Sequence, residues 1–114
     1  MEEKKIEGLL GMAQRAGKTA SGEFAIQKAI AAGKVKALIV AKDASGRFKE
    51  TMMKEAAEKS IPVYTWLTKD ELGRCLGKEY RAAAALLDEG FAGALGKKLQ
   101  PTAECVARIS EVGQ

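Results

Sequence analysis

The sequence contains no histidine and only two cysteines among its 114 residues. Histidine is the commonest general base at neutral pH and the commonest zinc ligand, so its absence counts against enzymes and zinc-binding modules. Cys75 and Cys105 lie far apart and form no CxxC pair, which argues against a zinc knuckle and a disulfide framework. We therefore expect reduced thiols in a cytoplasmic protein, with no metal site and no cofactor.

Long hydrophobic runs are also absent from the sequence. No apolar stretch approaches the roughly 18 to 20 residues that cross a bilayer. The first residues, Met-Glu-Glu-Lys-Lys, lead into an amphipathic pattern and not into the apolar core of a signal peptide. We expect no association with a membrane.

The composition fits a single soluble globular domain. Hydrophobic residues make up 46% of the chain and charged residues 30%, which is enough apolar material to bury a core. The length leaves room for one domain, expected over residues 1–100, followed by a C-terminal tail over 101–114. Nineteen Lys and Arg against fifteen Asp and Glu give a net charge of +4, which is compatible with an anionic partner.

Apolar residues recur at helical spacing in several parts of the chain. The stripe formed by Ile6, Leu9, Leu10 and Ala13 predicts the first helix, which Gly17 would end. Five helices are predicted in all: over 3–15, from Ser21 as N-cap to Gly33, from Ser45 as N-cap, over 69–76 behind a Thr68–Glu71 capping box, and over 91–99.

Short β-forming runs separate these helices. Residues 37–41 form an unbroken apolar run that is typical of a strand covered on both faces, and residues 63–66 are rich in β-formers. The run 82–87 is ambiguous, because its alanines favour a helix whereas its length and flanking loops favour a buried strand. The alternation predicts an α/β sandwich with a mainly parallel central sheet of about four strands.

Two patterns that resemble nucleotide-binding or catalytic motifs lack essential parts. Gly17-Lys18-Thr19 matches the end of a phosphate-binding loop, but Met12 occupies the position of the first glycine and a helix precedes the segment. Cys75 has no histidine to activate it, and a small, half-buried thiol near a helix end is usually a packing residue. We therefore predict no catalytic residue.

Basic residues gather near predicted helix ends and loops. They are Arg15 and Lys18 at the exit of the first helix, Lys28 near the start of the second helix, and Lys78 and Arg81, which flank Glu79 and Tyr80 in a later loop. If these loops converge at one end of the sandwich, they suit an RNA backbone with a splayed base. Scattered lysines that only solvate the surface explain the same pattern equally well.

Five segments, taken in order, resemble a known family. They are 8–18 (GLLGMAQRAGK), 21–34 with its Ser-Gly-Glu, Lys-Ala-Ile and Gly-Lys, 38–45 (LIVAKDAS), 61–64 (IPVY), and 71–92 with its Glu-Leu-Gly, Gly-Lys and Asp-Glu-Gly-Phe-Ala. Together they resemble the kink-turn RNA-binding family of ribosomal proteins L7Ae and L30e, most closely its bacterial YlxQ-type branch, over about residues 6–99. The resemblance implies a three-layer α/β/α sandwich with a four-stranded mixed sheet, in which 82–87 is a strand.

The resemblance also implies a function, because family members grip a kink-turn, a sharply bent RNA motif with tandem sheared G·A pairs. They do so through the start of the second helix and the loop before the last strand, which correspond here to Gly22–Lys28 and Gly77–Arg81. The expected RNA-binding residues are Arg15, Lys18, Gly22, Glu23, Phe24, Lys28, Lys78, Glu79, Tyr80 and Arg81. We expect a monomeric, non-enzymatic bacterial protein that binds structured RNA, either a kink-turn or ribosomal RNA, and that associates with the ribosome.

The sequence departs from the family pattern at the second helix. Kink-turn readers place Asn-Glu where this chain has Phe24 and Ala25, although Gly22 and Lys28 match. Phosphate contacts can survive this change, but base discrimination by those side chains cannot. Phe24 either stacks on an extruded base or packs inward. The alternative function is a protein-interaction module on the same fold that has lost specific RNA recognition, and steep salt dependence of binding would separate the two.

Overall fold

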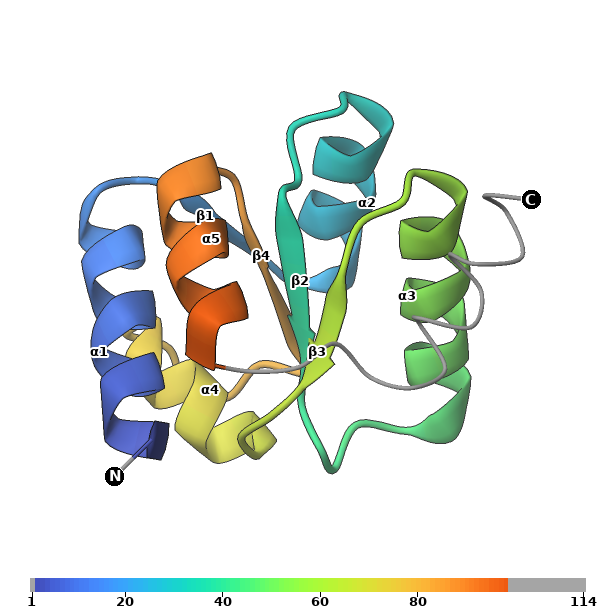
Figure 1. Cartoon of the computed structure of the whole chain (residues 1–114). Helices are drawn as coiled ribbons and strands as arrows, with labels where there is room; N and C mark the ends of the chain where they lie inside the picture. Colours follow the sequence, from blue (N-terminus) through green and yellow to red (C-terminus); the bar gives the residue numbers. More distant parts are fainter. Residues whose placement is uncertain (1, 99–114) are drawn as a thin grey trace.

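The computed structural model describes residues 2–98, which form three layers around one sheet (Figure 1). Helices α1, α4 and α5 cover one face, and α2 and α3 cover the other. The elements in chain order are α1 (Glu2–Arg15), β1 (Thr19–Ser21), α2 (Glu23–Ala31), β2 (Ala37–Val40), α3 (Gly46–Glu58), β3 (Val63–Thr65), α4 (Lys69–Cys75), β4 (Ala83–Leu86) and α5 (Glu89–Lys98). The predicted α/β/α sandwich is confirmed, and the expected tail 101–114 lies outside the described residues.

The sheet is mixed, with strand order β1-β4-β2-β3. Only β2 and β3 pair in parallel, whereas β4 runs antiparallel to both β1 and β2. The four-stranded mixed sheet implied by the family resemblance is confirmed, and the mainly parallel sheet predicted from alternation alone is wrong. Alternation of helix and strand indicates the layers, but it does not tell whether a strand re-enters the sheet in the same direction.

The ambiguous run 82–87 forms the central strand β4. Its residues Ala83–Leu86 are all buried between β1 and β2. The helical propensity of the alanines is overridden, because both edges of the strand find hydrogen-bonding partners and both faces are covered by helices. The small side chains let the helical layers approach the sheet closely, which suits a central strand.

Two of the three predicted helix caps are present. The Ser45 hydroxyl accepts a hydrogen bond from the backbone N–H of Phe48 at 3.2 Å, and Thr68 and Glu71 form the reciprocal capping box. The third is wrong, because Ser21 is the last residue of β1 and Gly22 occupies the N-cap of α2. Residue patterns did not predict β1, since Thr19–Ser21 is a short, half-buried edge strand without an apolar run.

The last helix begins two positions earlier than its expected start at Phe91. It opens at Glu89, and the Asp88 carboxylate accepts a hydrogen bond from the backbone N–H of Phe91 at 3.2 Å. The side chain of a residue before the helix thus satisfies a donor of its first turn, as an N-cap does.

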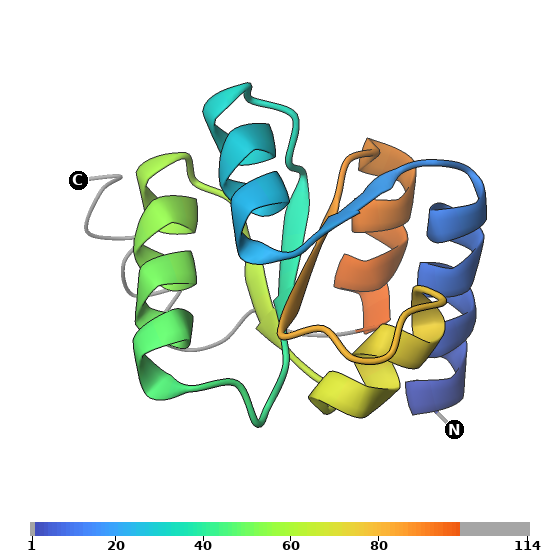
Figure 2. The same ribbon diagram turned by 180° about the vertical axis from the view of Figure 1, so that it is seen from behind.

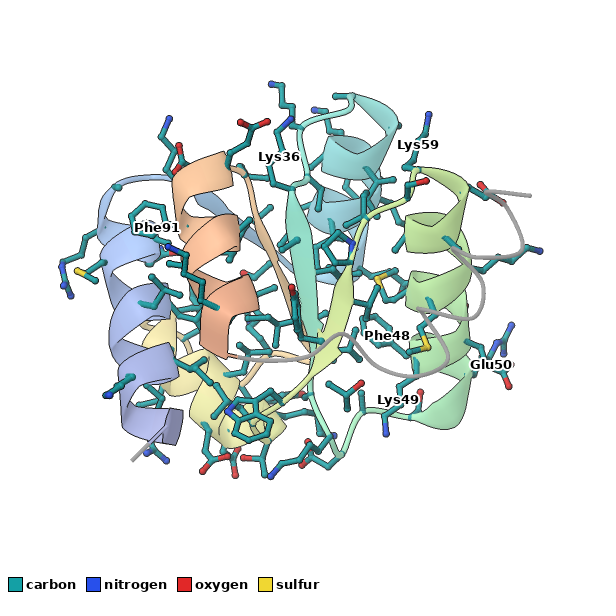
Figure 3. All side chains as sticks on the ribbon, viewed as in Figure 1. Lys36, Phe48, Lys49, Glu50, Lys59 and Phe91 are labelled. Atoms are coloured by element: carbon teal, nitrogen blue, oxygen red, sulfur yellow. The ribbon has the colours of Figure 1, made fainter. Side chains whose placement is uncertain are left out.

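One hydrophobic core holds the layers together. Ile6 and Leu10 from α1, Ile26 from α2 and Leu38 from β2 are fully buried in it. Phe48 points from α3 toward the sheet, whereas Glu50 points away from it (Figure 3). Among the described helices, none is long and apolar enough to cross a membrane.

Candidate nucleic-acid interface

The start of α2 leaves backbone donors without a capping side chain. Gly22 is the N-cap, with φ 91°, and forms no side-chain capping hydrogen bond. A left-handed φ of this kind favours glycine, because other L-residues are strained there. The N–H groups of the first helical turn, at Glu23, Phe24 and Ala25, therefore face outward with the positive end of the helix dipole.

The exposed face of α2 carries an aromatic ring and a lysine. Phe24 is 82% exposed, so of its two expected orientations the structure shows the outward one. Lys28 follows four positions later, is also exposed, and therefore lies on the same side of the helix. It sits in the last turn of α2, not near its start as expected, because the helix is only nine residues long.

The loop that connects α4 to β4 is fastened against α4. The N–H of Lys78 donates to the Gly73 carbonyl at 2.8 Å, and the N–H of Arg81 donates to the Lys69 carbonyl at 3.1 Å. A Cβ on Gly73 would lie 2.4 Å from the Cα of Tyr80, so only glycine allows this close approach. The path of the loop is thus set by backbone contacts with α4.

Tyr80 presents its ring to solvent at the tip of this loop. It is 57% exposed, and the Nζ of Lys69 lies 5.9 Å from the ring centroid in a cation–π arrangement. The backbone N–H of Lys69 in turn donates to the Asp43 carboxylate at 2.8 Å. Lys78 and Glu79, which precede Tyr80 in the loop, are also exposed.

Arg81 joins the two segments that sequence analysis singled out. Its Nε donates to the Ser21 hydroxyl at 3.2 Å, and its Nη1 donates to the Tyr80 carbonyl at 2.8 Å. The bond to Ser21 links the residue before Gly22 to the loop before β4. Figure 2 shows the corresponding backbone, with the end of β1 next to the start of β4. The start of α2 and the end of the loop before β4 are therefore in contact, whereas Lys28 lies in the last turn of α2.

Arg15 and Lys18 lie away from the contact between the start of α2 and the α4–β4 loop. In the β1–β4 register Ser21 pairs with Ala84 and Thr19 with Leu86, so Lys18 lies at the opposite end of β1 from Gly22. At about 3.3 Å per residue, the separation along the strand is on the order of 10 Å. Arg15 ends α1, and its Nη1 lies 3.5 Å from where a Cβ on Gly11 would be. The expected convergence of all the basic loops is therefore wrong for these two residues.

Sequence analysis missed two cations at this end of the molecule. Lys69 contacts Tyr80, and Arg47 lines a hollow of about 440 Å³ next to Glu23, together with Ser45, Phe48 and Thr51. Both residues occupy first turns of helices whose N-caps were predicted correctly. What the sequence does not contain is the direction in which each helix start faces.

The Cys75 thiol, which sequence analysis considered as a nucleophile, is half-buried. Burial, reinforced by the nearby Glu7 carboxylate, raises the pKa of the Cys75 thiol to about 11. The thiol is therefore protonated at neutral pH and is a poor nucleophile. No group of three or more acidic or cysteine side chains in the described part could hold a metal ion.

The four-stranded mixed sheet between two helical layers makes the protein an α/β/α sandwich, and the uncapped start of α2 beside the α4–β4 loop is a candidate anion-binding surface. Residues 4–96 match the family model of the ribosomal protein L7Ae/L30e/S12e/Gadd45 family. The chain belongs to this family.

Among its relatives is the RNA-binding protein YlxQ of Bacillus subtilis (strain 168), 34% identical over 87 residues that cover 76% of this chain and 87% of that protein. RNA-binding protein YlxQ of Enterococcus faecium is 32% identical over 89 residues, with coverages of 78% and 85%. The solved structure of a protein with unknown function from Bacillus halodurans C superimposes with a TM-score of 0.80 at 32% identity, and the match covers 82% of this chain and 95% of that one.

Proposed function

We propose that this protein binds structured, kink-turn-like RNA at the surface formed by the start of α2 and the α4–β4 loop, and that it does so as a monomeric, ribosome-associated cytoplasmic protein. The observation that carries the proposal is the Arg81–Ser21 hydrogen bond, which joins these two segments into one surface. Family membership and relatives named as RNA-binding proteins support the same function.

The surface offers several groups that attract phosphates. Outward-facing N–H groups at the start of α2 suit a phosphate oxygen, and Lys28 and Lys78 add exposed positive charge. A tightly bent RNA brings its phosphates close together, so a compact cationic surface binds the bent form more tightly than the open one. Differential affinity of this kind is sufficient to stabilise the bend.

Base recognition at this surface differs from that of the kink-turn readers that the sequence resembles. The side chains of Phe24 and Ala25 carry no polar atoms with which to read sheared G·A pairs. The ring of Phe24 is nevertheless 82% exposed, and Tyr80 is 57% exposed. We propose that an extruded base stacks on Phe24, since stacking on an aromatic ring tolerates any base.

A titration of the purified protein against two RNAs tests this function. One RNA is a standard kink-turn, and the other has both G·A pairs replaced, each measured at two salt concentrations. We expect preference for the intact motif and an affinity that falls steeply with salt, with a slope of about −0.7 to −0.9 in log K against log salt for each phosphate contacted. Lys28→Ala should weaken binding several-fold.

Lys59→Ala is the matched control, because Lys59 is an exposed lysine at the end of α3 (Figure 3), outside the proposed surface. Equal, salt-sensitive binding to both RNAs would keep RNA binding and contradict kink-turn recognition. No binding at moderate salt would overturn the RNA function. It would favour the protein-interaction module, for which the exposed Phe24 ring is the supporting observation.

A further inference from the structure

A shallow groove separates α1 from α4. It encloses about 440 Å³ and is lined by Glu7, Gly8, Gly11, Arg15, Arg74 and Cys75. Two glycines of α1 keep it open: a Cβ on Gly8 would meet nothing within 4 Å, and one on Gly11 would approach Arg15 Nη1 at 3.5 Å and the Cys75 carbonyl at 3.9 Å. The helix backbone itself therefore forms part of the groove floor.

Two guanidinium groups, from Arg15 and Arg74, line this groove, and Glu71 is close enough to Arg74 for the two charges to attract each other. Arg15 and Arg74 are both exposed, and among the described residues neither guanidinium group forms an ion pair within 4.0 Å or donates a hydrogen bond. Glu7 is the one carboxylate in the lining, so the groove carries a net positive charge.

The groove adjoins the proposed RNA surface. Arg74 follows Gly73, whose position against the Tyr80 backbone fixes the α4–β4 loop. The packing contact under Tyr80 and the guanidinium that lines the groove therefore belong to consecutive residues of α4. A ligand lying along the loop can reach both without crossing the molecule.

We propose that this groove is a second phosphate site for the same RNA, in which Arg15 and Arg74 together hold a backbone phosphate outside the bent motif. The proposal rests on the proposed function. Guanidinium groups suit a phosphate because their N–H donors match its oxygens in pairs. The site also gives Arg15 a role in RNA binding, although Arg15 lies apart from the start of α2.

The test compares variants in a titration against a kink-turn RNA with long flanking stems. We expect Arg15→Ala and Arg74→Ala each to lower the affinity about threefold to tenfold, and the double variant to reduce the slope of log K against log salt by about 0.7 to 0.9 for the lost phosphate. Arg15→Lys and Arg74→Lys should restore part of the affinity and most of the slope, because they keep the charge. Circular dichroism checks that all variants fold.

The double variant Lys34→Ala/Lys59→Ala removes the same charge at exposed positions outside the groove and should change the affinity less than twofold. The groove proposal is overturned if Arg15→Ala/Arg74→Ala behaves like this control while Lys28→Ala still weakens binding. In that case the proposed function stands. If the unaltered protein binds neither stem-extended nor plain kink-turn RNA, both proposals fall. Amide shifts at Gly8 and Gly11 on RNA addition would support the groove independently of any substitution.

Discussion

Phe24 is the most exposed large hydrophobic residue that the structure describes, at 82%. Contact between an exposed apolar ring and water is unfavourable, so covering the ring with a binding partner lowers the free energy. Its neighbours on this face of α2 are the outward N–H groups and Lys28, which attract an anion. An aromatic ring between phosphate-binding groups suits a nucleotide, whose base and phosphate need both kinds of contact.

Removing this ring should weaken RNA binding and leave the fold intact. Stacking of one base is worth about 1–3 kcal/mol, so Phe24→Ala should lower the affinity by a factor of about 5 to 150, whereas Phe24→Trp should keep it. Because the side chain contributes little to the core, the melting temperature should stay within about 2 °C of the unaltered value. Fluorescence titrations measure the RNA affinity, and thermal melts measure the melting temperature, of the unaltered protein and of the two variants. Full affinity of Phe24→Ala would remove the stacking role.

Gly73 shows that a helical glycine can be required by a neighbouring loop. Helix propensity alone predicts that Gly73→Ala stabilises α4 by about 1 kcal/mol. The Cβ would, however, lie 2.4 Å from the Cα of Tyr80, a backbone atom that cannot rotate away. We therefore expect a net loss of about 1–3 kcal/mol in the free energy of unfolding, measured by urea denaturation.

The matched control for Gly73→Ala is Gly93→Ala in α5, where a Cβ would meet nothing within 4 Å. There the propensity gain should appear undiminished, as a rise in stability. If both alanine variants gain stability, the close approach of the loop to α4 is not a constraint in solution. If only Gly73→Ala loses stability and it also binds RNA more weakly, the path of the α4–β4 loop is important for stability and for RNA binding.

At the scale of the element, α4 depends on its capping box for its start. The N–H of Thr68 donates to the Glu71 carboxylate at 2.8 Å, and the Thr68 hydroxyl accepts from the N–H of Glu71 at 3.2 Å. The hydrogen bond from the Thr68 backbone is the largest cause of a pKa for Glu71 below its ordinary value of 4.5. The ionised form of Glu71 is thus the one that the folded protein prefers.

This lowered pKa predicts a loss of stability in acid. Because the folded pKa lies below the unfolded one, the contribution of Glu71 is fully present above the unfolded pKa and disappears as the pH falls through the folded one. Glu71→Gln should melt lower than the unaltered protein at pH 7, and the difference should shrink below about pH 4.5. Calorimetric melts at pH 7, 5 and 3.5 measure it. A difference that is constant with pH would contradict the role of the ionised carboxylate.

At the scale of the whole molecule, the sequence predicted the layers better than the strand connections. The stripe through Ile6 and Leu10, the buried run at 37–41 and the Thr68–Glu71 box each depend on residues close in the chain, and each is confirmed. The antiparallel placement of β4 and the existence of β1 depend on pairing between distant segments. Local periodicity carries no information about such pairing.

In the candidate site, too, some features depend on residues close in the chain and others on contacts between distant segments. The exposed position of Lys28 was expected from the buried stripe of α2, whereas residue patterns left the orientation of Phe24 open. The contact of Gly73 with Tyr80 and the bond from Arg81 to Ser21 arise only when α4 and β1 take their places beside β4. Only the family resemblance predicted that these two segments act together, because Ser21 and Arg81 are sixty positions apart and share no local pattern.

The pairing of β1 with β4 has a consequence for the protein while it is being made. Thr19–Ser21 leaves the ribosome early, but its partner strand, Ala83–Leu86, is among the last parts of the domain to emerge. Until then Arg81 is not in place and the start of α2 has no loop beside it. A nascent chain would therefore carry only half of the proposed RNA surface, and we expect its affinity for RNA to appear only on completion of synthesis.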